Sequence, residues 1–167
     1  LGHEVLETPA IIEAVARDLG DICVRRQHGE PEVDRVQLAK VVFGDQEAMK
    51  RLNALTHPAL VNLAQSRLED LSRSGQHKLA VLEAAVYFLW PSMDEVDLVV
   101  SVIADPDVRR HRLMESRGLS SQQVNDRMAS QGDLEPFWPT ADVILENNAD
   151  LSAMQQKVDD LLKKINL

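Results

Sequence analysis

The fold class is decided by three apolar stretches, which read LAVLEAAVYF at residues 79–88, VDLVVSVI at residues 96–103 and ADVIL at residues 141–145. The first two are dense in apolar residues over the length of a strand, a pattern typical of strands that are buried on both faces. Stretches with helical spacing separate the second from the third. We therefore predict an α/β fold with a parallel sheet covered on both faces, with strands over residues 79–86, 96–103 and 141–145.

The rest of the chain favours helices, several of which carry start signals. These signals are Thr8 with Pro9, Asp34 with Gln37, Asp45, Thr56 with Pro58, and Ser120 with Gln123. Gly20 is placed to end the first helix. The expected helices span residues 9–19, 34–42, 45–55, 56–71, 106–115, 120–131 and 151–164. Residues 25–34 and 131–140 are expected to be irregular.

Composition limits the possible functions. The chain has 167 residues, 44% of them hydrophobic, which predicts a single domain over residues 1–167. With 27 acidic and 18 basic side chains, its surface would repel a nucleic-acid backbone. No apolar run is long enough for a membrane helix, so we expect no membrane partner. The single cysteine, Cys23, excludes an internal disulfide and fits a reducing compartment, the cytoplasm or an organelle matrix.

Four segments point to a family. They read LGHEVLE at residues 1–7, LNALTHP at residues 52–58, RLMESRGLSSQQVNDRMASQ at residues 112–131 and ADVILENN at residues 141–148. In this order they resemble dephospho-coenzyme A kinases over nearly the whole chain. The resemblance implies a P-loop kinase fold of three layers, with a helical acceptor-binding part at about residues 9–74 and a lid at about residues 112–140.

The same resemblance implies a reaction. Kinases of this family transfer the γ-phosphoryl group of ATP to the ribose 3′-hydroxyl of dephospho-coenzyme A with Mg²⁺, the last step of coenzyme A synthesis. The partners expected are therefore these two small molecules. Phosphoryl transfer needs a phosphate cradle, a base near the acceptor hydroxyl and arginine side chains that neutralise developing charge.

One part of that machinery is absent from the sequence. No G-x-x-x-x-G-K-[ST] motif occurs in the 167 residues. In the family this loop, and an acidic pair that serves the acceptor hydroxyl, precede the segment that matches residues 1–7. The chain as written should therefore be inactive. The family also has its first strand between those that match residues 79–86 and 96–103, so we expect a missing segment or a protein partner to complete the sheet.

The resemblance assigns catalytic roles to Glu83 and Arg127. Glu83 stands where the family tends to carry Asp, and it can hold Mg²⁺ through water or orient the acceptor. Its position in an apolar run favours a role, because burial of an unpaired carboxylate is costly. Arg127 can reach the ATP phosphates, although an exposed helical arginine is the alternative.

Binding roles follow from the same alignment. His57 and Pro58 are expected to contact the acceptor; the alternative for His57 is capping or packing. Arg117 at the mouth of the lid, and Asn147 and Asn148 after the last strand, are expected to bind ATP. Asparagine is also common in turns for local reasons. Trp90 and Trp138 can stack on adenine, but packing in the core or lid is the simpler interpretation. The histidines lack the spacing of a metal site, so no protein metal site is predicted.

Two other functions stay open. Leu89, Ser116 and Ala149 replace an acidic residue, an arginine and a glycine of the family pattern. These changes are also compatible with a degenerate pseudokinase, or an assembly subunit that kept the fold without catalysis. The other hypothesis is a kinase that acts on a different nucleoside phosphate, which substrate profiling would distinguish from a dephospho-coenzyme A kinase.

Overall fold

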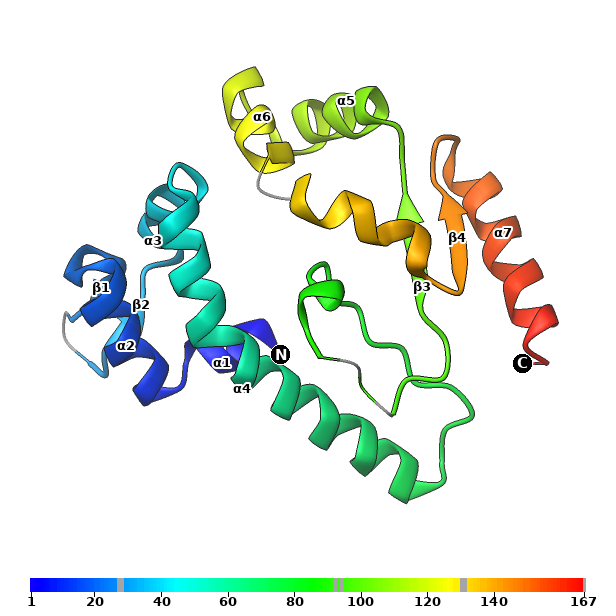
Figure 1. Ribbon diagram of the computed structural model, residues 1–167, viewed down its shortest axis with the longest axis horizontal. Helices are drawn as coiled ribbons and strands as arrows, with labels where there is room; N and C mark the ends of the chain where they lie inside the picture. Colours follow the sequence, from blue (N-terminus) through cyan, green and yellow to red (C-terminus); the bar gives the residue numbers. More distant parts are fainter. Residues whose placement is uncertain (27–28, 92, 94, 130–131, 167) are drawn as a thin grey trace. The chain divides into compact units, whose positions relative to one another are not determined.

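The structure is a computed structural model that describes residues 1–167 except residues 27–28, 92, 94, 130–131 and 167. The side chains of residues 117, 132 and 133 also lie outside the description. The chain forms two compact units, Leu1–Asp70 and Leu71–Leu167. Figure 1 labels the helices and strands of both units. No helix among the described residues has the length and apolar character that a membrane span requires.

The first unit is mostly helical. Its elements are α1 (Gly2–Leu6), α2 (Pro9–Leu19), the 3₁₀ turn η1 (Asp21–Cys23), β1 (Val24–Arg25), β2 (Glu32–Val33), α3 (Arg35–Phe43) and α4 (Gln46–Ser74). The last four residues of α4 extend past the boundary at Asp70. Its core consists of buried apolar side chains from α2, η1, β1, α3 and the start of α4. They are Ile12, Val15, Leu19, Cys23, Val24, Leu38, Val42 and Ala48.

Local signals explain where several helices begin and end. α2 has the predicted bounds, with Pro9 in its first turn and Gly20 after its end at φ 103°, a backbone angle that favours glycine. Asp34 accepts hydrogen bonds from the backbone N–H groups of Val36 and Gln37 at the start of α3. Thr8 is the N-cap residue of α2 as predicted, but its side chain makes no capping hydrogen bond, because its hydroxyl donates to the Glu4 carbonyl.

Two predictions about the first unit were wrong. Residues 46–74 form one helix, α4, in place of the two helices expected on either side of Thr56. Buried residues recur on both sides of Pro58, so packing keeps both halves helical despite the lost hydrogen bond, and α4 changes direction part-way along its length (Figure 1). Within the segment expected to be irregular, β1 and β2 form a short antiparallel pair.

The second unit contains a parallel strand pair. Its elements are the 3₁₀ turn η2 (Tyr87–Leu89), β3 (Val100–Ile103), α5 (Pro106–Arg117), α6 (Ser121–Ala129), the 3₁₀ segment η3 (Gly132–Thr140), β4 (Val143–Glu146) and α7 (Leu151–Lys164). β3 and β4 are parallel, with Val100 opposite Val143 and Ile103 opposite Glu146. α7 contacts β4, and η3 contacts β3. The predicted α/β class with a parallel sheet is confirmed.

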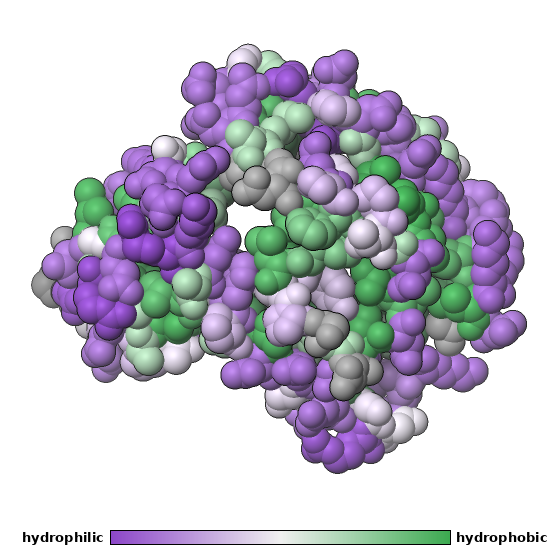
Figure 2. All heavy atoms as spheres, viewed as in Figure 1, coloured by the Kyte–Doolittle hydropathy of each residue, from purple (hydrophilic) through white to green (hydrophobic). Residues whose placement is uncertain are grey.

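The strand predicted over residues 79–86 is wrong. These residues form no strand, and Leu79 and Val81 are 48% and 82% exposed. A strand needs a neighbour to satisfy its backbone hydrogen bonds, and the described residues provide none for this segment. Figure 2 shows hydrophobic residues at the surface on one face of the molecule. The other two strands are confirmed, although β3 begins at Val100, four residues later than expected.

Candidate functional site

The loop after β4 is bound to the end of β3. The backbone N–H of Asn147 donates to the Ile103 carbonyl at 2.7 Å, and the side-chain oxygen of Asn148 accepts from the Asp105 N–H at 2.7 Å. Ligands of open α/β sheets bind outside the carboxyl ends of parallel strands, which is the position of this loop. The structure therefore places the loop of Asn147 and Asn148 at the carboxyl end of β3, the end of a parallel sheet where ligands generally bind.

Arg112 of α5 also holds this loop. One guanidinium nitrogen donates to the Asn147 carbonyl at 2.7 Å, and the other donates to the Ala149 carbonyl at 2.8 Å. Sequence reasoning missed Arg112, because its partners lie 35 and 37 residues further along the chain. Its place at the start of the RLMESRGLS segment was the only available signal.

The two predicted phosphate-binding arginines lie on neighbouring helices. α6 begins at a reciprocal capping box, in which Ser120 and Gln123 each accept a hydrogen bond from the backbone N–H of the other. Val124 is fully buried, and α6 contacts α5 and η3. Arg127 lies half-buried in the last turn of α6. Arg117 is the last residue of α5, and its side chain lies outside the described residues.

The aromatic residues of the second unit pack against protein groups. The Arg109 guanidinium lies 5.1 Å from the centroid of the Trp138 ring and donates to Glu135 at 2.7 Å. The Phe88 ring stacks on Phe137 with centroids 6.5 Å apart, and the Tyr87 ring is a neighbour of both Phe88 and Trp90. These contacts favour the packing interpretation of both tryptophans over stacking on adenine.

Glu83 is exposed and lies four residues before η2. The argument from burial in a strand was therefore wrong, because this carboxylate is neither in a strand nor enclosed. Across the described part of the chain, no three His, Cys, Asp or Glu side chains come together in a way that could hold a metal ion.

His57 and Pro58 lie within α4 and not at a helix start as predicted. Pro58 is exposed, whereas His57 is half-buried. Burial lowers the pKa of His57 from its ordinary value of 6.5, so the imidazole is neutral at neutral pH. A neutral imidazole can both donate and accept a hydrogen bond, which suits contact with a hydroxyl group.

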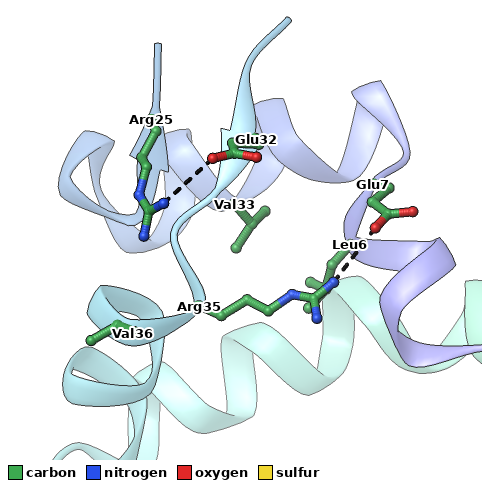
Figure 3. A pocket seen from close by; sticks show the side chains of 7 residues that line it. All are labelled: Leu6, Glu7, Arg25, Glu32, Val33, Arg35 and Val36. Atoms are coloured by element: carbon green, nitrogen blue, oxygen red, sulfur yellow. Dashed lines mark ion pairs between the residues drawn. The ribbon is translucent and has the colours of Figure 1, made fainter. Parts of the chain in front are cut away.

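The first unit has a small pocket that the sequence did not predict (Figure 3). Its volume is about 270 Å³, and Leu6, Glu7, Arg25, Glu32, Val33, Arg35 and Val36 line it. Both arginines are paired: Arg25 with Glu32 at 3.5 Å and Arg35 with Glu7 at 3.6 Å. Since the two positive charges are matched by two negative ones, the pocket has no net attraction for an anion.

Comparison with known proteins decides the family. The family model described as "CoaE: Dephospho-CoA kinase" matches residues 4–153, which is most of the chain. The chain belongs to the dephospho-CoA kinase family. A protein named dephospho-CoA kinase from Geobacter sulfurreducens is 34% identical over 132 residues, covering 79% of this chain and 66% of that protein. The chain spans 60% to 66% of the length of three such curated relatives.

Solved structures support the dephospho-CoA kinase fold. The crystal structure of TT1252 from Thermus thermophilus has a TM-score of 0.62 at 27% identity, over 93% of this chain and 81% of that one. A dephospho-CoA kinase from Campylobacter jejuni has a TM-score of 0.54 at 20% identity, over 98% of this chain and 80% of that one. The second likeness is one of fold alone. The expectation of a kinase-like α/β fold of this family is confirmed.

The predicted site residues of this dephospho-CoA kinase family member are divided between the two units. His57 and Pro58 belong to the first unit, and the other five belong to the second. Within the second unit, the loop of Asn147 and Asn148 contacts α5, the helix that ends at Arg117. α5 in turn contacts α6, which carries Arg127. The individual roles of these residues stay predictions.

Proposed function

We propose that this protein transfers the γ-phosphoryl group of ATP to the ribose 3′-hydroxyl of dephospho-coenzyme A, the last step of coenzyme A synthesis. The observation that carries the proposal is the family match over residues 4–153. The loop of Asn147 and Asn148, held at the carboxyl end of β3, supports it, because this is where an α/β sheet binds a ligand. The buried thiol of Cys23, the single cysteine, fits a reducing compartment such as the cytoplasm or an organelle matrix.

The proposed residue roles follow the two ends of the reaction. Asn147 and Asn148 contact the adenine of ATP, while Arg127 and Arg117 neutralise charge on the transferred phosphoryl group. Arg127 is suited to this role because α6 is anchored by the buried Val124 three residues earlier.

At the acceptor end, the neutral His57 beside Pro58 contacts dephospho-coenzyme A. Glu83 orients the acceptor hydroxyl or supports the metal. Because Glu83 is exposed and lies outside regular structure, its carboxylate is free of the desolvation cost that a buried acid pays.

Mg²⁺ is the metal that ATP-dependent phosphoryl transfer uses. It usually keeps several waters and is held by one or two carboxylates together with substrate phosphates, so a site made of protein groups alone is not required. The described residues contain no cluster of three metal-binding side chains, and Glu83 is the one we assign near the metal.

Replacement of arginine tests the proposal and separates it from the pseudokinase alternative. Arg127→Ala should lower kcat for dephospho-coenzyme A phosphorylation by about a hundredfold or more, the range for loss of a charged group that acts at the transition state. Arg17→Ala is the matched control, because this exposed guanidinium pairs with the adjacent Asp18 on the surface of α2. A natural protein that binds ATP without any turnover would favour the pseudokinase, and equal activity of both variants would remove Arg127 from the mechanism.

A further inference from the structure

Arg112 makes two charged hydrogen bonds to one loop. Its guanidinium reaches from the middle of α5 to the carbonyls of Asn147 and Ala149, which flank Asn148. Hydrogen bonds from a charged donor are shorter and about twice as strong as neutral ones. A planar guanidinium presents its donors in a fixed geometry, so two carbonyls bound to it are held at a fixed separation.

The same loop has further anchors on either side of this pair. Asn148 accepts from the Asp105 N–H, and the Asp150 carboxylate accepts from the Ala153 N–H at the start of α7 at 2.9 Å. Lys157 of α7 donates to the Glu146 carbonyl at 2.5 Å. None of these contacts involves the carbonyls of Asn147 and Ala149. Within the part of the chain that the structure describes, Arg112 is the side chain that donates to those two carbonyls.

We propose that Arg112 is a positioning residue for the purine base of the nucleotide substrate. This inference rests on the proposed function, in which the loop of residues 147–149 contacts the base of ATP. A carbonyl oxygen has two lone pairs, so a carbonyl bound to Arg112 can still accept a second hydrogen bond. Adenine carries an amino group on the edge where guanine carries a carbonyl. A backbone carbonyl of the loop held in a fixed position can accept a hydrogen bond from the amino group of adenine, but not from the carbonyl of guanine.

The chemistry predicts a specific kinetic effect. If Arg112 sets the position of the loop, its removal leaves the phosphate-transfer groups in place and weakens contact with the base. The loss then falls on nucleotide binding and on the preference for adenine. A site built to hydrogen-bond one polar group loses its discrimination when that geometry is relaxed.

The test compares Arg112→Ala with His111→Ala in the natural protein. His111 is the adjacent residue of α5, is exposed, and its Nε2 lies 3.3 Å from a Glu115 carboxylate oxygen on the same helix. Steady-state kinetics with ATP and with GTP give KM and kcat, and thermal unfolding gives Tm. For Arg112→Ala we expect an increase of about tenfold in the KM for ATP, kcat within about twofold, and a reduced ATP-to-GTP preference. His111→Ala should match the natural protein.

A second variant covers the case in which Arg112→Ala does not fold. Arg112→Lys keeps the charge but lacks the planar pair of donors, so its KM for ATP should lie between those of Arg112→Ala and the natural protein. An unchanged KM for ATP in a folded variant would overturn the inference. So would an equal loss with ATP and GTP accompanied by a lower Tm, since that result indicates a purely structural role.

Binding of a fluorescent ATP analogue without acceptor separates this inference from the proposed function. If the natural protein binds the analogue but does not phosphorylate dephospho-coenzyme A, the proposed function fails while the effect of Arg112 can still be measured. Weaker analogue binding by the Arg112 variants, with His111→Ala unchanged, would support the positioning role. Equal binding by all four proteins would contradict it.

Discussion

Val124→Ala tests whether the packing of α6 supports the activity of Arg127. The Val124 side chain is fully enclosed, with 0% exposure, on the helix that contacts α5 and η3. The substitution removes two methyl groups, and each contributes about 0.8 kcal/mol by transfer alone. The cavity left behind adds to this cost, so we expect a loss of about 1.5–3 kcal/mol in the free energy of unfolding. For a chain of this length, Tm should fall by about 3–12 °C.

The assay is thermal unfolding followed by kinetics at a temperature where the variant is folded. Ser121→Ala is the control, because Ser121 is exposed at the start of the same helix. Since Arg127 lies one turn after Val124, a loosened α6 should also reduce kcat for phosphoryl transfer. A Tm within about 1 °C of the natural protein would refute the packing argument. A lower Tm with unchanged kcat would refute the link between α6 and catalysis.

Three further predictions concern charged or titratable groups. Asp34 has a pKa of about 2, lowered first by its hydrogen bond to Arg25, so Arg25→Gln should raise that pKa in carboxyl NMR titrations. The stability that ionised Asp34 contributes is fully present above pH 3.8 and is lost as the pH falls toward 2. His57 should titrate below 6.5 by NMR, and because the unfolded chain takes up this proton first, stability should rise with pH through that range. Glu83→Gln should lower kcat without changing Tm, since Glu83 is exposed; a lower Tm would show a structural role.

Helix ends were predictable where a local signal determines them. Pro9 and Gly20 mark the ends of α2 through restrictions on φ that act within one or two residues. The same holds for Asp34 at α3, whose side chain bonds backbone groups two and three residues away. Such contacts form whatever the rest of the fold does, and a single sequence therefore contains enough information to locate them.

Features that depend on distant neighbours were not predictable. Pro58 is a local signal for a helix boundary, yet packing on both sides of it keeps α4 continuous. The apolar run at residues 79–86 has the composition of a strand, but hydrogen bonds from a partner are what make a strand. Apolar composition predicts burial, and it does not provide the partner that burial requires.

In the candidate site, too, the residues with a local signal were predicted and those that depend on distant contacts were not. The resemblance located Asn147 and Asn148 after the last strand, and the structure places their loop at the end of β3. The roles of Arg112 and Arg109 were not predicted, because each arginine binds partners more than 25 residues further along the chain, within residues 135–149. Only folding brings these guanidinium groups to the groups that they bind.

The most direct test of the account is phosphoryl transfer itself. The purified natural protein is incubated with ATP, Mg²⁺ and dephospho-coenzyme A, and the product is identified by mass spectrometry and ³¹P NMR. The account predicts coenzyme A, with the new phosphate on the ribose 3′-hydroxyl, and little product from other nucleoside acceptors. Absence of phosphorylation in a folded protein that binds ATP, or transfer to a different acceptor in preference, would contradict it.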